Sequence, residues 1–116
     1  MILALVDDLF FSSKISETAR QLNRPLRLVK DRAQTLIELE ACPEKLIVDL
    51  NAKCNPTEVI REVRQLRPAL PIVAFGSHVQ TELLQAARDA GCEQVVARSY
   101  FSSHLPEILG PALPPT

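Results

Sequence analysis

Five short apolar runs alternate with four amphipathic stretches along this chain of 116 residues. Each run is rich in branched aliphatic side chains and mostly lacks polar alternation, which is typical of strands buried on both faces of a sheet. The runs are Ile2–Val6, Leu26–Val29, Leu46–Val48, Ile72–Phe75 and Val95–Ala97. Strands that alternate with helices over short links form parallel sheets with right-handed crossovers. The sequence therefore predicts an α/β fold.

The stretches between the runs repeat apolar residues at helical spacing. Asp31 and Ser77 stand where N-caps are expected, and Asn55 before Pro56 predicts a capped helix that begins with proline. Gly91 predicts a left-handed helix end. The four expected stripes are Phe11, Ile15, Thr18 and Leu22; Ala33, Leu36, Ile37 and Glu40; Val59, Ile60, Val63 and Leu66; and Leu83, Leu84, Ala87 and Ala90.

Three carboxylates directly follow two of the apolar runs. Asp7 and Asp8 come after the first run, and Asp49 comes after the third. A five-stranded unit of this size is best arranged as a doubly wound sheet in the order 2-1-3-4-5, which makes these two strands neighbours at the switch point. We therefore expect the three acids in one pocket, with Ser77 and Arg98 at the ends of flanking strands. Such a cluster can hold a divalent cation or accept a phosphoryl group; the alternative is that these residues only cap helices and solvate strand ends.

Composition narrows the class of protein. Hydrophobic residues make up 47% of the chain but aromatic ones only 4%, which predicts one domain with an aliphatic core. The formal net charge is −1 without a basic stripe, and no apolar stretch is long enough to span a membrane, so neither nucleic acid nor membrane is an expected partner. The N-terminus has no signal-peptide pattern, and Cys42, Cys54 and Cys92 have no metal-site spacing. We expect a cytoplasmic protein with free thiols.

The end of the chain predicts an unusually short last helix. Pro106 fits a first helical turn, but Gly110 follows soon afterwards. We expect one domain over residues 1–109 and a flexible proline-rich tail over 110–116. The apolar residues that a short helix would leave at the surface are Leu105, Ile108 and Leu109. A homodimer is possible, and the first helix with Phe10 is the expected contact.

Taken in order, these motifs resemble the receiver domain of bacterial two-component response regulators. Leu5-Val6-Asp7-Asp8 is similar to that family's acidic pair, and Leu46-Ile47-Val48-Asp49-Leu50 is similar to its phosphoacceptor strand. The segment from Ala90 to Val96 resembles the family's entry into the fifth strand. The resemblance covers essentially residues 1–109 and implies a flavodoxin-like, receiver-like sheet.

The resemblance also implies a set of site residues. Asp49 would be the phosphoacceptor. Asp8, Asp49 and the backbone carbonyl of Asn51 would bind a magnesium ion, and Asp7 would support it through water. These oxygen ligands suit a hard cation.

Three positions depart from the family pattern. Gly76 stands where a hydroxyl residue normally ends the fourth strand, and Ser77 is the candidate replacement. Arg98 stands in place of a lysine and is expected to pair with Asp49; the alternative is that Arg98, with Ser77, replaces the missing helpers of phosphorylation. Val95 stands in place of the family's aromatic switch residue. This pattern resembles an atypical receiver, or pseudo-receiver.

The expected function is that of a non-enzymatic, stand-alone signalling module that docks to another signalling protein, a histidine kinase or an output protein, with weak or no phosphorylation. The alternative is a working phosphoacceptor of two-component signal transduction, or of a phosphorelay, that a histidine kinase phosphorylates at Asp49 with magnesium. A third class, a small α/β enzyme or nucleotide-binding domain, is disfavoured because the loop after the first strand is Asp7-Asp8-Leu9-Phe10-Phe11 rather than glycine-rich.

Overall fold

The structure is a computed structural model that describes residues 1–110. Five parallel strands form one sheet in the order β2-β1-β3-β4-β5, which confirms the predicted doubly wound α/β fold. Every strand lies within one residue of its predicted bounds. In chain order the elements are β1 (Ile2–Leu5), α1 (Leu9–Gln21), β2 (Leu26–Val29), α2 (Arg32–Leu39), β3 (Lys45–Asp49), α3 (Pro56–Leu66), β4 (Ile72–Gly76), α4 (Thr81–Ala90), β5 (Gln94–Ala97), α5 (Arg98–Ser103) and α6 (Leu105–Leu109). The predicted tail falls on 111–116, outside the described residues, apart from Gly110.

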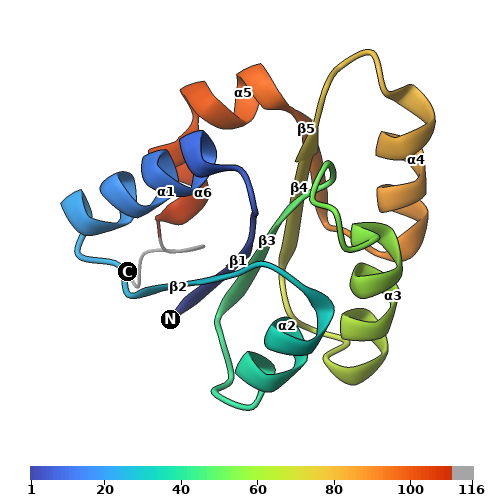
Figure 1. The fold of residues 1–116 in the computed structure, drawn as a ribbon, viewed down its shortest axis with the longest axis horizontal. Coiled ribbons are helices and arrows are strands. Elements are labelled where there is room, and N and C mark those ends of the chain that lie inside the picture. Colours follow the sequence, from blue (N-terminus) through green and yellow to red (C-terminus); the bar gives the residue numbers. More distant parts are fainter. Residues whose placement is uncertain (111–116) are drawn as a thin grey trace.

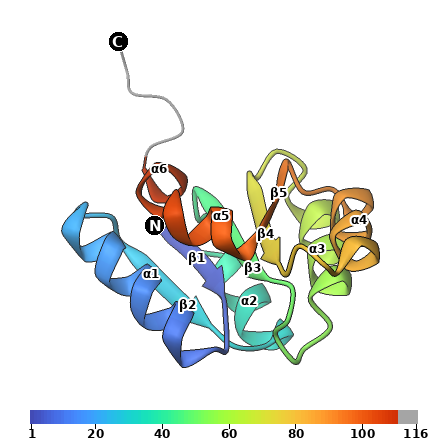
Figure 2. The ribbon, with the colours of Figure 1, turned by 90° about the horizontal axis from the view of Figure 1, so that it is seen from above.

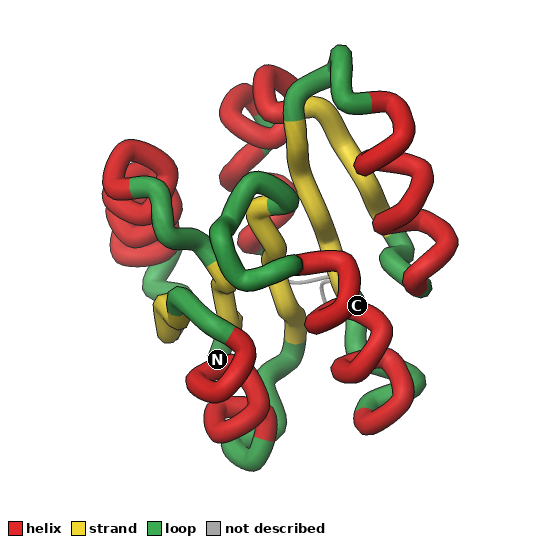
Figure 3. The backbone as a smooth tube through the Cα atoms, turned by 45° about the vertical axis from the view of Figure 1, so that its right-hand side comes forward, coloured by secondary structure: helices red, strands yellow, loops and turns green. Residues whose placement is uncertain are grey.

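The sheet is the middle of three layers (Figures 1 and 3). Helices α2, α3 and α4 cover one face with an aliphatic core, and α3 and α4 lie side by side (Figures 1 and 2). Helices α1, α5 and α6 cover the other face, where the core includes Phe11, Phe75 and Phe101. The rings of Phe75 and Phe101 are stacked with centroids 3.9 Å apart. The few aromatic side chains of the sequence are thus concentrated on one side of the sheet.

The strand register brings the carboxyl ends of β1, β3 and β4 to one edge. Leu5 pairs with Val48, so the acids that follow β1 lie beside the end of β3. Asp49 in turn pairs with Phe75, directly before Gly76. The expectation of burial on both faces is wrong for the edge strand β2, where Arg27 and Leu28 are exposed, because an edge strand has a neighbour on one side only.

Three of the predicted helix stripes are partly wrong. In α1 the buried residues are Phe11, Ile15 and Ala19, while Leu22 lies beyond the last turn and is 40% exposed. In α2, Thr35 and Leu39 are buried and the predicted Ile37 is 67% exposed. The Thr35 hydroxyl donates to the Asp31 carbonyl at 2.8 Å, which satisfies the polar group and lets this side chain face the core. In α3, Val59, Ile60 and Val63 are buried as predicted, but Leu66 is 52% exposed.

Three of the four predicted helix boundaries are confirmed. Asp31 caps α2, Pro56 begins α3, and Gly91 ends α4 with φ 114°. Asn55 makes no capping bond with its side chain and has a left-handed backbone, with φ 57°. Ser77 does not cap α4, because this helix begins only at Thr81.

The last helix is short, as predicted, but it is split at His104 into α5 and α6. The prediction of exposed apolar side chains there is wrong: Leu105, Ile108 and Leu109 are all buried. The break turns α6 back against α1, and its apolar residues join the core on that face.

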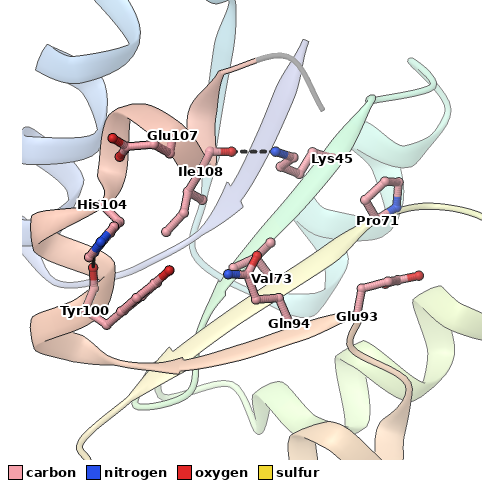
Figure 4. Close-up of a pocket in the computed structure, with 9 residues that line it drawn as sticks. All are labelled: Lys45, Pro71, Val73, Glu93, Gln94, Tyr100, His104, Glu107 and Ile108. Carbon is pink, nitrogen blue, oxygen red and sulfur yellow. Dashed lines mark hydrogen bonds between the residues drawn. The ribbon is translucent and has the colours of Figure 1, made fainter. Parts of the chain in front are cut away.

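Two cations hold the end of α6. The buried Lys45 donates from Nζ to the carbonyl of Ile108 (Figure 4), and Arg24 donates from Nε to the carbonyl of Leu109 at 3.0 Å. Cations at a helix C-terminus donate hydrogen bonds to its free carbonyls and interact favourably with the negative end of the helix dipole. Burial lowers the pKa of Lys45. A cavity of about 310 Å³ lies beside this contact.

Within residues 1–110, no helix is both long and apolar enough to cross a membrane.

Candidate functional site

The structure brings the three sequence-predicted acids together in one open cavity of about 520 Å³ at the carboxyl edge of the sheet. The loops after β1 and β3 supply most of its wall. Arg98 at the end of β5 also reaches it, whereas Ser77 does not. The lining residues are Asp7, Asp8, Phe11, Lys30, Asp49, Asn51, Lys53 and Arg98.

Each acid accepts a hydrogen bond from a backbone N–H of the chain. Asp8 Oδ1 accepts from Phe11 at 2.9 Å and so caps α1, which is the structural role that the sequence left open. Asp7 Oδ2 accepts from Lys53 at 2.9 Å. Asp49 Oδ1 accepts from Asn51 at 2.9 Å. These bonds orient the carboxylates and use one oxygen of each.

Asp49 is the least solvated of the three, with 3% of its surface exposed. Burial raises its pKa, and the charges of Asp7 and Asp8 raise it further. The N–H of Asn51 and the charge of Arg98 act in the opposite direction. A carboxylate with this environment favours either a proton or a cation close by.

Arg98 does not form the predicted salt bridge. Within residues 1–110, Asp49 has no ion pair with an N···O distance of 4.0 Å or less. The Arg98 guanidinium carbon instead lies 5.8 Å from the centre of the Phe11 ring, within range of a cation–π contact. Arg98 begins α5, and the Phe11 ring belongs to the aromatic cluster on the α1 side of the sheet.

Lys30 and Lys53 are lining residues that the sequence reasoning missed. Lys30 follows β2 directly, and Lys53 lies in the loop after Asp49. Both follow the ends of strands β2 and β3, so the argument that selected the acids could have found them. With Arg98, they place three cations around three acids, so the cavity has no net formal charge.

The donor atoms fit a magnesium ion by type. Carboxylate oxygens of Asp8 and Asp49 and the backbone carbonyl of Asn51 are hard ligands, and magnesium usually takes one or two carboxylates and keeps several waters. Residues 1–110 nevertheless contain no group of three or more His, Cys, Asp or Glu side chains close enough to hold an ion together. The three acids share a cavity without forming a ready-made cage.

The fourth strand brings no hydroxyl to the cavity. Gly76 ends β4 and has no side chain. Ser77 lies in a neighbouring groove with His78 and Ser99, and its Oγ accepts from the Val79 N–H at 3.4 Å. Ser77 is therefore not a lining residue of the acidic cavity, and its role as a replacement for the missing hydroxyl stays a prediction.

No family model matches the sequence, and no curated protein matches it. Solved structures match the fold. The receiver domain of NtrX from Brucella abortus gives a TM-score of 0.82 at 16% identity, over 93% of this chain and 93% of that chain. The chain has the receiver fold. The chemotaxis response regulator CheY4 of Vibrio cholerae gives 0.80 at 19% identity, over 93% of both chains.

A third receiver structure concerns the metal directly. The receiver domain of the sensor histidine kinase PA1611 from Pseudomonas aeruginosa PAO1 gives a TM-score of 0.80 at 21% identity, over 93% of this chain and 92% of that chain. That protein has a magnesium ion coordinated in its active site cleft. At such identities the likeness establishes the receiver fold, so the chemistry of this cavity depends on the side chains that the chain places in it.

Proposed function

We propose that this chain is a receiver-like signalling module that acts by docking to another signalling protein, with weak or no phosphorylation of Asp49. One observation carries the proposal: among residues 1–110, no hydroxyl side chain lines the acidic cavity. A phosphoryl group on Asp49 would lack the side-chain hydroxyl that receivers use to hold it. Arg98, the remaining assistant, is placed over Phe11 and forms no ion pair with Asp49.

Exposed apolar side chains near the same edge of the sheet support a docking role. Leu9 and Phe10 begin α1 and are 78% and 67% exposed, and Val79 follows β4 and is 72% exposed. Large apolar side chains that gather near one site are typical of protein interfaces. The proposed partner is a histidine kinase or an output protein, and a second copy of the chain is the other option.

The shared cavity favours a second candidate function, that of a working phosphoacceptor. Asp49 would accept a phosphoryl group from a histidine kinase, while Asp8 and the Asn51 carbonyl would hold magnesium and Asp7 would support it through water. The bound metal would neutralise charge between the acids and the incoming phosphoryl group. The residues themselves would orient Asp49 through the N–H of Asn51, which already donates to its Oδ1.

Phosphate-affinity electrophoresis after acetyl phosphate treatment separates the two functions. We expect little or no retarded band with or without magnesium, and the same pattern for Asp49→Asn. A strong magnesium-dependent band that disappears in Asp49→Asn would reject weak phosphorylation and establish the phosphoacceptor function.

A further inference from the structure

The side-chain amides of Asn51 and Gln80 join two loops that belong to different strands. Asn51 Nδ2 donates to Gln80 Oε1 at 3.1 Å, and Gln80 Nε2 donates back to Asn51 Oδ1 at 2.9 Å. The same Gln80 Oε1 accepts from the backbone N–H of Ser77 at 3.0 Å. One side chain therefore ties the loop after β3 to both ends of the segment between β4 and α4.

Gln80 also fills the space beside Gly76. A β-carbon on Gly76 would lie 3.5 Å from Gln80 Oε1, 3.4 Å from Leu84 Cδ2 and 3.5 Å from Leu50 Cδ1. The β-carbon alone would make ordinary contacts, but a longer side chain would have to displace one of these three groups. The glutamine amide thus lies beside the position from which a hydroxyl side chain would extend.

The link continues to the acidic cavity. The backbone N–H of Asn51 donates to Asp49 Oδ1, so hydrogen bonds run without interruption from Asp49 through Asn51 and Gln80 to Ser77. Amide groups pair reciprocally only when both side chains hold a fixed orientation, because each group must present its donor and its acceptor together.

We propose that Gln80 is a latch that holds the segment from Ser77 to Gln80 against the loop after β3 in one permanent arrangement. The latch takes the structural place of the missing hydroxyl at Gly76 and keeps His78 and Val79 displayed in the free protein. This inference rests on the proposed docking function for the use of the displayed surface. The latch itself is a property of the free protein.

Amide hydrogen exchange of the free protein, followed residue by residue with NMR, tests the latch. Gln80→Ala removes the acceptor of the Ser77 N–H, and we expect exchange of that amide to accelerate about tenfold, as for the loss of one ordinary hydrogen bond. Asn51→Ala leaves that acceptor in place but releases Gln80, so the latch predicts acceleration at Ser77 here as well. The double variant should exchange no faster than Gln80→Ala.

Gln85→Ala is the matched control, because Gln85 is an exposed glutamine of α4, the helix that follows Gln80, and its side chain donates to Asp89 within that helix. It should leave the Ser77 amide unchanged. Wild-type exchange at Ser77 in Asn51→Ala, with acceleration confined to Gln80→Ala, would show that Gln80 only closes a local turn and would overturn the latch. Phosphorylation and docking play no part in this measurement. An exchange result that rejects the latch would therefore leave the proposed function standing. Conversely, a strong phosphate-affinity band would reject the proposed function and leave the latch standing.

Discussion

The guanidinium carbon of Arg98 lies 5.8 Å from the centre of the Phe11 ring. Arginine side chains are attracted to aromatic faces, and here the ring belongs to the cluster on the α1 side of the sheet. Arg98 still influences Asp49 through space, where its charge favours the ionised carboxylate. The two residues should therefore contribute almost independently to stability.

Arg98→Ala should lower the free energy of unfolding by about 0.5–1 kcal/mol, the usual value of a surface cation–π contact. The loss should be the same in the Asp49→Asn background, and Arg98→Lys should lose part of it. Urea unfolding of the four proteins of the double-mutant cycle measures this. A coupling energy well above about 1 kcal/mol would mean that Arg98 and Asp49 form an ion pair after all.

Asp49→Asn should stabilise the metal-free protein at pH 7. Burial raises the pKa of Asp49 above its ordinary value of 3.8, so the folded state binds its proton more tightly than the unfolded state does. The ionised carboxylate therefore destabilises the fold above the folded-state pKa. This penalty declines as the pH falls through that pKa, and it is absent below 3.8.

Thermal unfolding in a metal chelator across pH 3 to 8 checks this linkage. The melting temperature of Asp49→Asn should exceed that of the wild type near neutral pH and converge with it in acid. An Asp49→Asn protein that is less stable than the wild type at pH 7 would contradict the assignment.

Lys53→Ala should raise the affinity for magnesium by about two- to fivefold, because a lysine that lines the cavity repels a divalent cation over a short distance. Lys30→Ala should act in the same direction. Arg88→Ala removes the same charge from an exposed position on α4 and is the matched control. Competition against Mn²⁺, followed by water-proton relaxation, gives the affinities. Equal magnesium affinities for wild type, Lys53→Ala and Arg88→Ala would show that the lysine charges do not weaken magnesium binding.

The three cysteines should differ in reactivity. Burial raises the pKa of Cys92 to about 12 and raises that of Cys54, whereas Cys42 is exposed. At pH 8, only about one Cys92 thiol in ten thousand would be ionised, and the thiolate is the reacting form. Peptide mapping after brief iodoacetamide treatment should find Cys42 modified first. Faster labelling of Cys92 than of Cys42 would contradict the burial that the structure shows.

The sequence was sufficient for those features that local patterns determine. Unalternated apolar runs located all five strands, and the topology rules then placed Asp49 beside Asp7 and Asp8. The sequence was insufficient wherever one side chain has possible partners on different distant segments. Arg98 could have turned toward Asp49 or toward Phe11, and no spacing rule separates the two.

The contact between Asn51 and Gln80 could not be predicted from the sequence for the same reason. Asn51 and Gln80 lie 29 positions apart, and glutamine at a helix start carries no signal for a partner across two loops. The burial of Leu105 and its neighbours was likewise unpredictable, because it depends on the break at His104 and on Lys45 and Arg24, which hold the end of α6.

Under the proposed function, the state of Asp49 does not switch the distant surface of this receiver fold. Gly76 has no side chain to be drawn toward a phosphoryl group, Val95 has no ring to turn inward, and Gln80 already holds the loop. A conformational change requires contacts that differ between two states, and we propose that this chain lacks them. NMR chemical shifts recorded with and without magnesium and beryllofluoride, a mimic of the phosphoryl group, test this most directly. We expect changes confined to the neighbourhood of Asp8 and Asp49, and large changes across residues 83–97 would contradict the proposed function.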